Sequence, residues 1–124
     1  MNALKTYTPE RRKSIRIPFW SILRYRIRDE VQTRRNNDVT YGNSLNLSVG
    51  GLCFETFEQI PIGAHLVLTL ALPMYPLRKL KIEGEVLRCE KINLTDLYTI
   101  ALSFKDVNDT DRFAFAEFIE HFLK

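Results

Sequence analysis

The sequence predicts an all-β domain, a six-stranded antiparallel β-barrel followed by a C-terminal α-helix. Apolar and polar residues alternate through the middle of the chain, as they do in strands with one buried face. Turn-forming residues interrupt the alternation at 36–38, 61–63 and 73–76. Near the end of the chain the apolar spacing becomes helical. Six short strands favour closure into a barrel, because a barrel leaves fewer exposed edges than an open sheet.

The strands are expected at about Phe19–Asp29, Thr40–Leu47, Gly51–Thr56, His65–Leu72, Leu80–Glu90 and Leu97–Lys105. In the first strand Leu23, Tyr25 and Ile27 alternate with arginines, so the arginines are interpreted as a solvated face: Arg24, Arg26 and Arg28. In the last strand the alternation separates two faces, one with Tyr98, Ile100, Leu102 and Phe104, the other with Thr99, Ala101 and Ser103.

The helix is expected at Asp109–Leu123. Its apolar face is formed by residues spaced at i, i+3, i+4 and i+7: Phe115, Phe118, Ile119 and Phe122. Asn108 or Asp109 can cap the first turn. This face is expected to plug the barrel mouth or to pack on the barrel wall, and docking onto another subunit is the alternative.

Composition indicates a single globular domain. The 124 residues are 45% hydrophobic and 27% charged, an ordinary balance for a folded domain of this length. We expect residues 1–16 to form a flexible basic N-terminal arm and residues 17–124 to form the barrel and helix. The N-terminus lacks the pattern of a signal peptide, and the longest apolar stretch, 66–77, is too short to span a bilayer. A cytoplasmic location is therefore expected.

Charge is unevenly distributed along the chain. Residues 1–35 hold ten Lys and Arg and three Asp and Glu, a net charge of +7, so the remainder carries −4 of the overall +3. A basic N-terminal part favours an anionic partner.

Two short segments carry the strongest indication of a binding site. Arg12 and Arg16 lie four residues apart, and each guanidinium group can form two hydrogen bonds with a phosphate or with the O6 and N7 atoms of guanine. Asn46 and Ser48 alternate onto one face of a strand end. The glycine pair 50–51 that follows is expected to adopt positive φ and to let a ligand approach closely. A ligand with both phosphates and guanine edges suits this combination.

These segments resemble the PilZ domain, a bacterial receptor module for cyclic di-GMP. The resemblance rests on an R-x-x-x-R arm, a [D/N]-x-S-x-x-G element, the Pro61-Ile62-Gly63 turn and the strand 98–104, and it covers roughly residues 10–124. It implies a ligand-binding set of seven residues: Arg11, Arg12, Arg16, Asn46, Ser48, Gly50 and Gly51. Arg12 and Arg16 would hold phosphate and guanine Hoogsteen edges, and Asn46 and Ser48 would meet the second guanine and nearby phosphate oxygens.

The chain departs from the family pattern at two positions. Ala101 stands where the family usually has Gly, and Asn46 stands where Asp is at least as familiar. A methyl group at Ala101 would narrow the pocket, and Asn46 lacks the charge that strengthens a bond to guanine. Arg11 looks suited to stacking on a guanine of a second ligand molecule, which implies two cyclic di-GMP molecules per chain. One ligand, with Arg11 solvated, is the alternative.

We therefore expect a cyclic di-GMP receptor or adaptor without enzymatic activity, cofactor or metal. Its arm would close over the ligand and present a surface to a protein effector, such as a flagellar, secretion or polysaccharide-synthesis component. His65, His121, Cys53 and Cys89 do not have the spacing of metal ligands, and Ser48 lacks the context of a catalytic serine. The oligomeric state is expected to be monomer or homodimer.

Two alternatives remain at this stage. The domain could be a ligand-silent PilZ-like adaptor that signals through protein contacts alone. It could also bind single-stranded nucleic acid on a platform of Trp20, Tyr25 and the arginines of 24–28, although Tyr25 is predicted to face inward.

Overall fold

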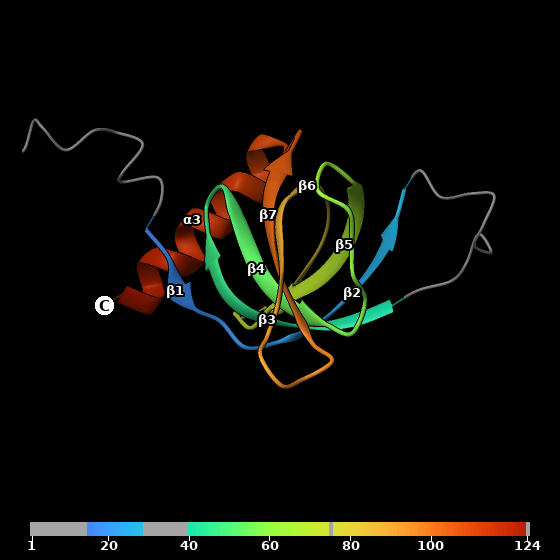
Figure 1. Cartoon of the computed structure of the whole chain (residues 1–124). Helices are drawn as coiled ribbons and strands as arrows, with labels where there is room; N and C mark the ends of the chain where they lie inside the picture. Colours follow the sequence, from blue (N-terminus) through green and yellow to red (C-terminus); the bar gives the residue numbers. More distant parts are fainter. Residues whose placement is uncertain (1–14, 29–39, 75, 124) are drawn as a thin grey trace, which may run out of the picture.

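The computed structural model of the chain describes residues 15–28, 40–74 and 76–123. Within these ranges it contains seven strands and one helix (Figure 1). They are β1 (Ile17–Pro18), β2 (Ile22–Ile27), β3 (Thr40–Ser48), β4 (Gly51–Thr56), β5 (His65–Leu72), β6 (Arg78–Lys91), β7 (Tyr98–Lys105) and α3 (Asp109–Leu123). The predicted flexible arm falls almost entirely outside the described residues.

All strand pairs are antiparallel, and six of the strands form a closed ring. The order is β3-β2-β5-β6-β7-β4, and β4 pairs again with β3, which closes the barrel. The predicted six-stranded antiparallel barrel with a C-terminal helix is confirmed. β1 is an additional short strand outside the ring, paired with the second half of β3.

The first predicted strand starts later than expected, and a short strand that was not predicted precedes it. Its start was expected at Phe19, but β2 begins at Ile22, and β1 precedes it at Ile17–Pro18. The buried hydroxyl of Ser44 explains the break, because it accepts a hydrogen bond from the Ser21 amide at 2.9 Å and donates one to the Phe19 carbonyl at 2.6 Å. These bonds hold the chain between β1 and β2 in a bend across the edge of β3.

The barrel interior is filled by side chains from the inward face of each strand. In β2, Leu23, Tyr25 and Ile27 are buried, and Arg24 points outward, so the predicted alternation is confirmed. The Tyr25 ring packs against Phe54, and its hydroxyl lies 2.8 Å from the Thr56 hydroxyl. Tyr25 therefore cannot serve as an exposed stacking platform.

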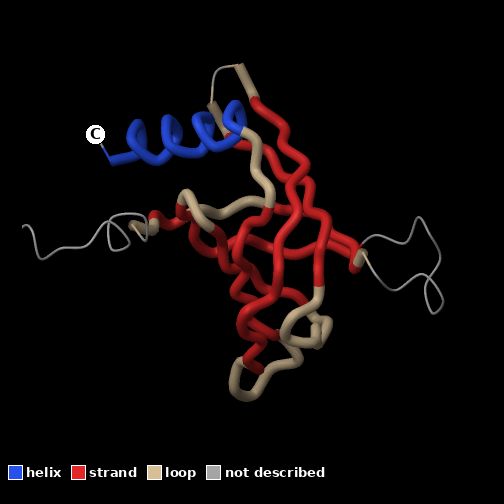
Figure 2. Tube along the Cα trace, turned by 90° about the horizontal axis from the view of Figure 1, so that it is seen from above, coloured by secondary structure: helices blue, strands red, loops and turns tan. Residues whose placement is uncertain are grey.

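The helix α3 begins as predicted. The Asn108 side-chain oxygen caps it by accepting a hydrogen bond from the Asp111 amide at 2.8 Å. Figure 2 shows α3 lying alongside the barrel rather than inside it, and it contacts β1 and β3. Phe115 is fully buried and stacks on Phe104 with ring centroids 5.0 Å apart. The helix packs on the outside of the barrel, and its buried face holds the helix there.

One member of the predicted helix face departs from expectation. Phe122 was predicted on the buried side, but 50% of its surface is exposed. The reason is its position near the C-terminal end of α3, which extends past the barrel strands (Figure 2). Only the first three turns of the helix have barrel surface to cover.

Candidate ligand-binding site

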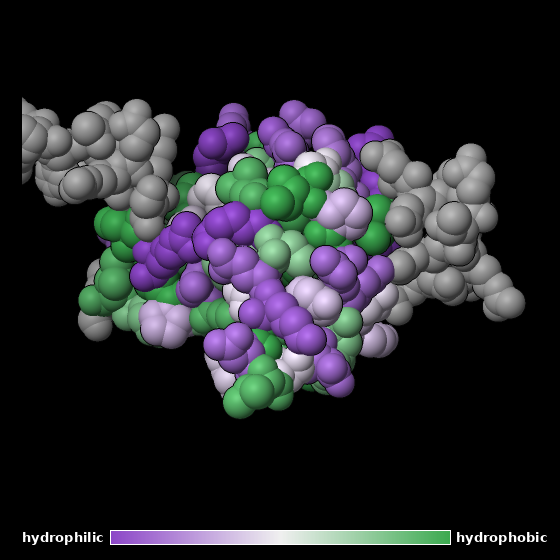
Figure 3. Space-filling model, in the orientation of Figure 1, coloured by the Kyte–Doolittle hydropathy of each residue, from purple (hydrophilic) through white to green (hydrophobic). Residues whose placement is uncertain are grey.

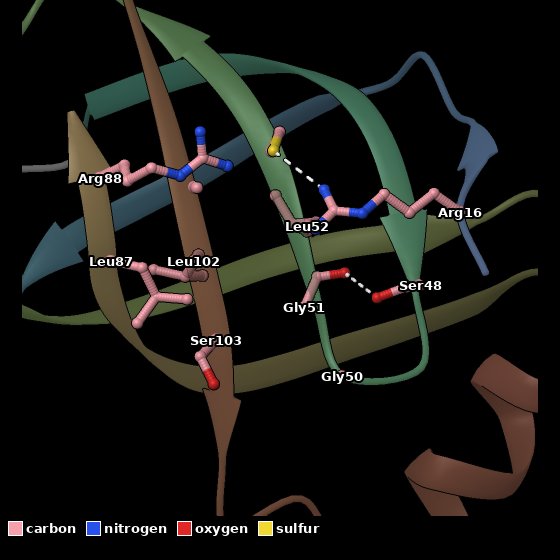
Figure 4. Close-up of a pocket in the computed structure, with 11 residues that line it drawn as sticks. Arg16, Ser48, Gly50, Gly51, Leu52, Leu87, Arg88, Leu102 and Ser103 are labelled. Atoms are coloured by element: carbon pink, nitrogen blue, oxygen red, sulfur yellow. Dashed lines mark hydrogen bonds between the residues drawn. The ribbon is translucent and has the colours of Figure 1, made fainter. Parts of the chain in front are cut away.

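A pocket of about 290 Å³ lies on the outer face of the barrel, where β4, β7 and β6 run side by side. This volume is at the lower end of the range for small-molecule sites. Its lining combines two arginines and small residues with three leucines, Leu52, Leu87 and Leu102, and the members used below are Arg16, Ser48, Gly51, Cys53, Arg88, Ala101 and Ser103 (Figure 4). The pocket is open to solvent.

The pocket floor is a row of cross-strand neighbours. Arg88 on β6 is opposite Ala101 on β7, Ala101 is opposite Cys53 on β4, and Cys53 is opposite Asn46 on β3. Neighbouring strands are about 4.8 Å apart, so these four positions cross the sheet almost perpendicular to the strands. Cys53 and Ala101 are only 7% and 5% exposed although they lie on the outer face. The two small side chains form the centre of the floor.

Arg16 covers one end of this row. Its Nη1 atom donates to the side-chain oxygen of Asn46 at 3.4 Å and lies 3.6 Å from the Cys53 sulfur. Arg16 immediately precedes β1, in which Ile17 is opposite Leu47 and Pro18 is opposite Asn46, and this pairing brings the Arg16 side chain within reach of the Asn46 side chain. Two residues that belong to separate sequence motifs are thus in contact.

Arg88 lies at the other end of the row because of a β-bulge. The register between β6 and β7 shifts between Val86 and Arg88, which leaves Leu87 as the extra residue. Val86 is buried, whereas Leu87 and Arg88 both lie on the outer face. In Figure 4 the guanidinium groups of Arg16 and Arg88 point toward one another across β4 and β7. Arg88 also forms a loose ion pair with Glu90 at 3.8 Å.

A second row contributes hydroxyl groups and glycine backbone. Ser48 is opposite Gly51, and Gly51 is opposite Ser103. The Ser48 hydroxyl donates to the Gly51 carbonyl at 3.3 Å (Figure 4). The two serines border the pocket below the arginines.

The role expected for the glycine pair is corrected by the structure. Gly50 and Gly51 were expected to adopt positive φ, but in the part of the chain that is described the glycine with positive φ is Gly63. Gly51 is needed for another reason, since a Cβ atom there would lie 2.1 Å from the Leu102 carbonyl oxygen. Close approach of β4 to β7 therefore requires glycine at this position. A Cβ at Gly50 would meet nothing within 4 Å.

The predicted site residues are distributed as follows. Arg16, Ser48, Gly50 and Gly51 line the pocket, and Asn46 is joined to it through Arg16. Arg11 and Arg12 lie outside the described residues.

Arg88 is not among the site residues predicted from the sequence, although the sequence holds a signal for it. The inward positions of β6 run at intervals of two, Leu80, Ile82, Gly84 and Val86, and the next in phase is Arg88. An unpaired arginine is almost never buried in a barrel core. A bulge before Arg88 was therefore required, and it turns the side chain onto the outer face.

The described residues hold no cluster of three or more His, Cys, Asp or Glu side chains that could bind a metal ion. Cys53 and Cys89 are both free thiols. No helix in the described ranges is long and apolar enough to cross a lipid bilayer.

Comparisons with known proteins agree with this geometry. The family model of the PilZ domain matches residues 10–121. No curated protein sequence matches the chain significantly. Among solved structures, the inhibitor of motility MotI/DgrA of Bacillus subtilis superposes with a TM-score of 0.72 at 18% identity, over 88% of this chain and 50% of that one. MrkH of K. pneumonia in its apo state gives 0.62 at 19% identity, over 88% and 48%.

The PilZ domain of YcgR from Escherichia coli, solved with cyclic di-GMP, gives a TM-score of 0.59 at 11% identity, over 82% of this chain and 83% of that one. The chain thus spans about half the length of the MotI and MrkH chains and most of the YcgR domain. At these identities the structural likeness establishes a shared fold.

Proposed function

This chain belongs to the PilZ domain family, and from that premise we propose that it is a non-enzymatic receptor for cyclic di-GMP. PilZ domains are regulatory receptors or adaptors rather than enzymes. The observation that carries the proposal is the placement of Arg16 beside Asn46, at the edge of a pocket that also contains Ser48 and Gly51. Both halves of the family motif meet on one face of the barrel.

The pocket chemistry suits a guanine dinucleotide with two phosphates. Arg16 and Arg88 supply ten guanidinium N–H donors in two planar groups, which can bind phosphate oxygens or the O6 and N7 edge of guanine. Asn46 offers both a donor and an acceptor to a guanine edge. Ser48 and Ser103 can donate to phosphate oxygens, and the small floor of Cys53 and Ala101 leaves room for a planar base.

Ligand binding requires Arg16 to exchange partners. In the structure its guanidinium group is held by the neutral Asn46 side chain at 3.4 Å and the Cys53 sulfur at 3.6 Å, two weak contacts. A phosphate would form charge-assisted hydrogen bonds with the same group, which are roughly twice as strong as neutral ones. Arg16 is therefore positioned at the site but available to the ligand.

The arm of residues 1–16 completes the proposed site. Arg12 precedes Arg16 by four residues, and Arg11 lies beside it in sequence. We propose that these side chains close over the ligand, and that ordering of a basic arm by a dianion creates a surface for an effector protein. The closed arm is the conformational signal.

Calorimetric titration with cyclic di-GMP tests the proposal, with cyclic di-AMP, GTP and a single-stranded oligonucleotide as comparison ligands. We expect cyclic di-GMP to bind most tightly, because an arginine side chain can donate to both the O6 and N7 acceptors of guanine, whereas adenine has an amino group in place of O6. Equal affinity for cyclic di-AMP would remove the guanine assignment. Binding of the oligonucleotide alone would favour a nucleic-acid function, and no binding of any ligand would identify a ligand-silent adaptor.

The same titration determines the stoichiometry. We propose two cyclic di-GMP molecules per chain, the second stacked on the Arg11 guanidinium group. At protein concentrations well above the dissociation constant, the equivalence point reports the ratio directly. Arg11→Ala should lower it from two to one, whereas a wild-type ratio of one would exclude the stacked pair.

A further inference from the structure

A second charged surface lies on the outer face of β2, β5 and β6, away from the pocket. Arg24 on β2 is opposite Thr69 on β5, and Thr69 is opposite Lys81 on β6. Arg26 follows on the same side of β2, and these residues border a shallow depression of about 140 Å³. Two cations thus flank a hydroxyl group, with a third beside them. We refer to Arg24, Arg26 and Lys81 as the basic row.

The basic row is not neutralised, in contrast to the cations next to it. Arg28 forms an ion pair with Glu83 at 2.6 Å, and Lys105 forms one with Glu85 at 3.0 Å. The hydrogen bond from Lys105 also holds the pKa of Glu85 below its usual value. Within the described ranges, none of the ion pairs involves a member of the basic row.

An apolar groove adjoins the basic row. It has a volume of about 510 Å³ and is lined by exposed side chains, chiefly Ile22, Tyr41 and Phe57, which are 69%, 61% and 74% exposed. Tyr41 is the cross-strand neighbour of Arg24, and Ile22 precedes Arg24 by two residues on the same side of β2. The basic row and the groove therefore form one continuous surface.

The groove also extends toward the β6–β7 connection. Leu97 from this connection lines it, and the side chain of Leu94 is completely exposed in the same connection. Figure 3 shows a small apolar area at the lower tip of the molecule, beside hydrophilic side chains, where Figure 1 places this loop. Exposed apolar side chains gathered in this way are typical of protein interaction sites.

We propose that this surface docks an acidic segment of a partner protein, with apolar side chains in the groove and carboxylates on the basic row. Charge complementarity favours an acidic partner, since three neighbouring cations that have no ion pair among the described residues repel one another until an anion binds. Glu55 lines the groove, so the carboxylates of the segment are expected on the basic row and its apolar side chains in the groove. Ile22 and Leu97 offer aliphatic contact rather than a stacking platform.

The docking surface is separate from the nucleotide pocket. β3 belongs to both, with Tyr41 near one end of the strand and Ser48 at the other. Partner and nucleotide can therefore be bound at the same time. Docking of the partner requires no nucleotide. The inference rests on the proposed function only where it calls the partner an effector.

The test uses the full chain, labelled with ¹⁵N, and a synthetic peptide of three Glu-Phe-Asp-Leu repeats. We expect its binding to shift amide resonances of 22–26, 41 and 67–69. Arg24→Glu combined with Arg26→Glu should weaken binding at least about tenfold, and Phe57→Ala should weaken it severalfold. These side chains point outward, so we expect the variants to remain folded. Dispersed amide resonances in their spectra will check this. Arg112→Glu, a charge reversal at an exposed position on α3, which does not line the groove, is the matched control.

Four results would overturn the inference. The first is equal binding of a peptide of three Lys-Phe-Lys-Leu repeats, and the second is a set of shifts that map outside this surface. The third is an acidic peptide that fails to bind at millimolar concentration. The fourth is tighter binding of oligothymidine than of the acidic peptide to the same residues. Arg16→Ala should keep peptide binding and lose cyclic di-GMP, so failure of the nucleotide proposal and failure of the docking inference are distinguishable.

Discussion

Two outer faces of the barrel carry arginines, and the arginines are arranged differently on each face. On the face of β2, β5 and β6 the strands pair without any register shift, and Arg24 and Arg26 simply alternate with buried residues. On the pocket face the pairing is irregular, with register shifts between Ser44 and Asn46 and between Val86 and Arg88. The regular face keeps its cations side by side, whereas the irregular face turns Arg16 and Arg88 toward a common floor.

The pocket face differs from the regular face because its arginine side chains point toward a common floor, not because it carries more cations. A regular strand projects its side chains in parallel at fixed intervals. The β-bulge turns the Arg88 side chain to the outer face, and the added strand β1 brings Arg16 over the pocket floor. Both devices are present on the pocket face, and each can be tested separately.

The largest effect is expected from Gly51→Ala. A Cβ atom would lie 2.1 Å from the Leu102 carbonyl oxygen, so β4 and β7 would have to separate. We expect the free energy of unfolding to fall by about 3 kcal/mol, as for severe overpacking. Urea denaturation measures this loss. Gly50→Ala is the matched control, since its Cβ meets nothing within 4 Å and should change stability by less than about 1 kcal/mol.

Arg16→Ala should have the next largest effect, on ligand binding rather than on stability. Loss of a charge-assisted contact to phosphate or guanine should weaken cyclic di-GMP binding by about 2 kcal/mol, roughly thirtyfold. The melting temperature should change little because the Arg16 contacts in the structure are weak. Arg24→Ala, the same change on the regular face, is the control for calorimetry. Equal losses from the two variants would show that the general basic field binds the ligand.

A smaller loss is expected from Arg88→Ala. The Arg88 side chain is 55% exposed and forms an ion pair with Glu90 at 3.8 Å. Solvent therefore screens part of its interaction with a ligand. We expect cyclic di-GMP affinity to fall by about 1 kcal/mol, measured by calorimetry beside Lys91→Ala. If the two variants behave alike, the bulge at Leu87 does not serve ligand binding.

Ala101→Gly should produce the smallest change. We expect it to raise the affinity for cyclic di-GMP and to lower the free energy of unfolding. Removal of the methyl group deepens the floor and should raise cyclic di-GMP affinity by up to about 0.8 kcal/mol. Glycine in the middle of β7 should lower the unfolding free energy by about 0.5–1 kcal/mol. Titration and urea denaturation of one preparation check both. An affinity that stays constant or falls would mean that the ligand does not reach the floor.

The regular parts of the molecule were predictable from the sequence. Alternation located the six barrel strands, and the spacing of Phe115, Phe118 and Ile119 located the helix, because one-sided burial imposes these periods. Arg16, Asn46 and Ser48 were predicted to act together, and the structure brings Arg16 and Asn46 into contact.

The irregular parts were not predictable in the same way. β1 has two residues, one of them proline, so it is too short to show alternation. Pairing with β3 creates it, and that contact is not local in sequence. Arg88 was missed because one inserted residue reverses the face of those that follow. The positive φ expected at Gly51 was wrong because the need for glycine comes from Leu102 on another strand.

Cys53 gives the pocket a built-in chemical reporter. Its thiol lies at the centre of the floor, 3.6 Å from Arg16 and 7% exposed, and it is a free cysteine. A maleimide must enter the pocket to reach it, so its alkylation rate measures how often the floor is open. Occupation of the floor by a nucleotide base should slow this reaction, and Cys89, which does not line the pocket, supplies the reference rate in the same sample. The protein can therefore be followed by mass spectrometry without an added label.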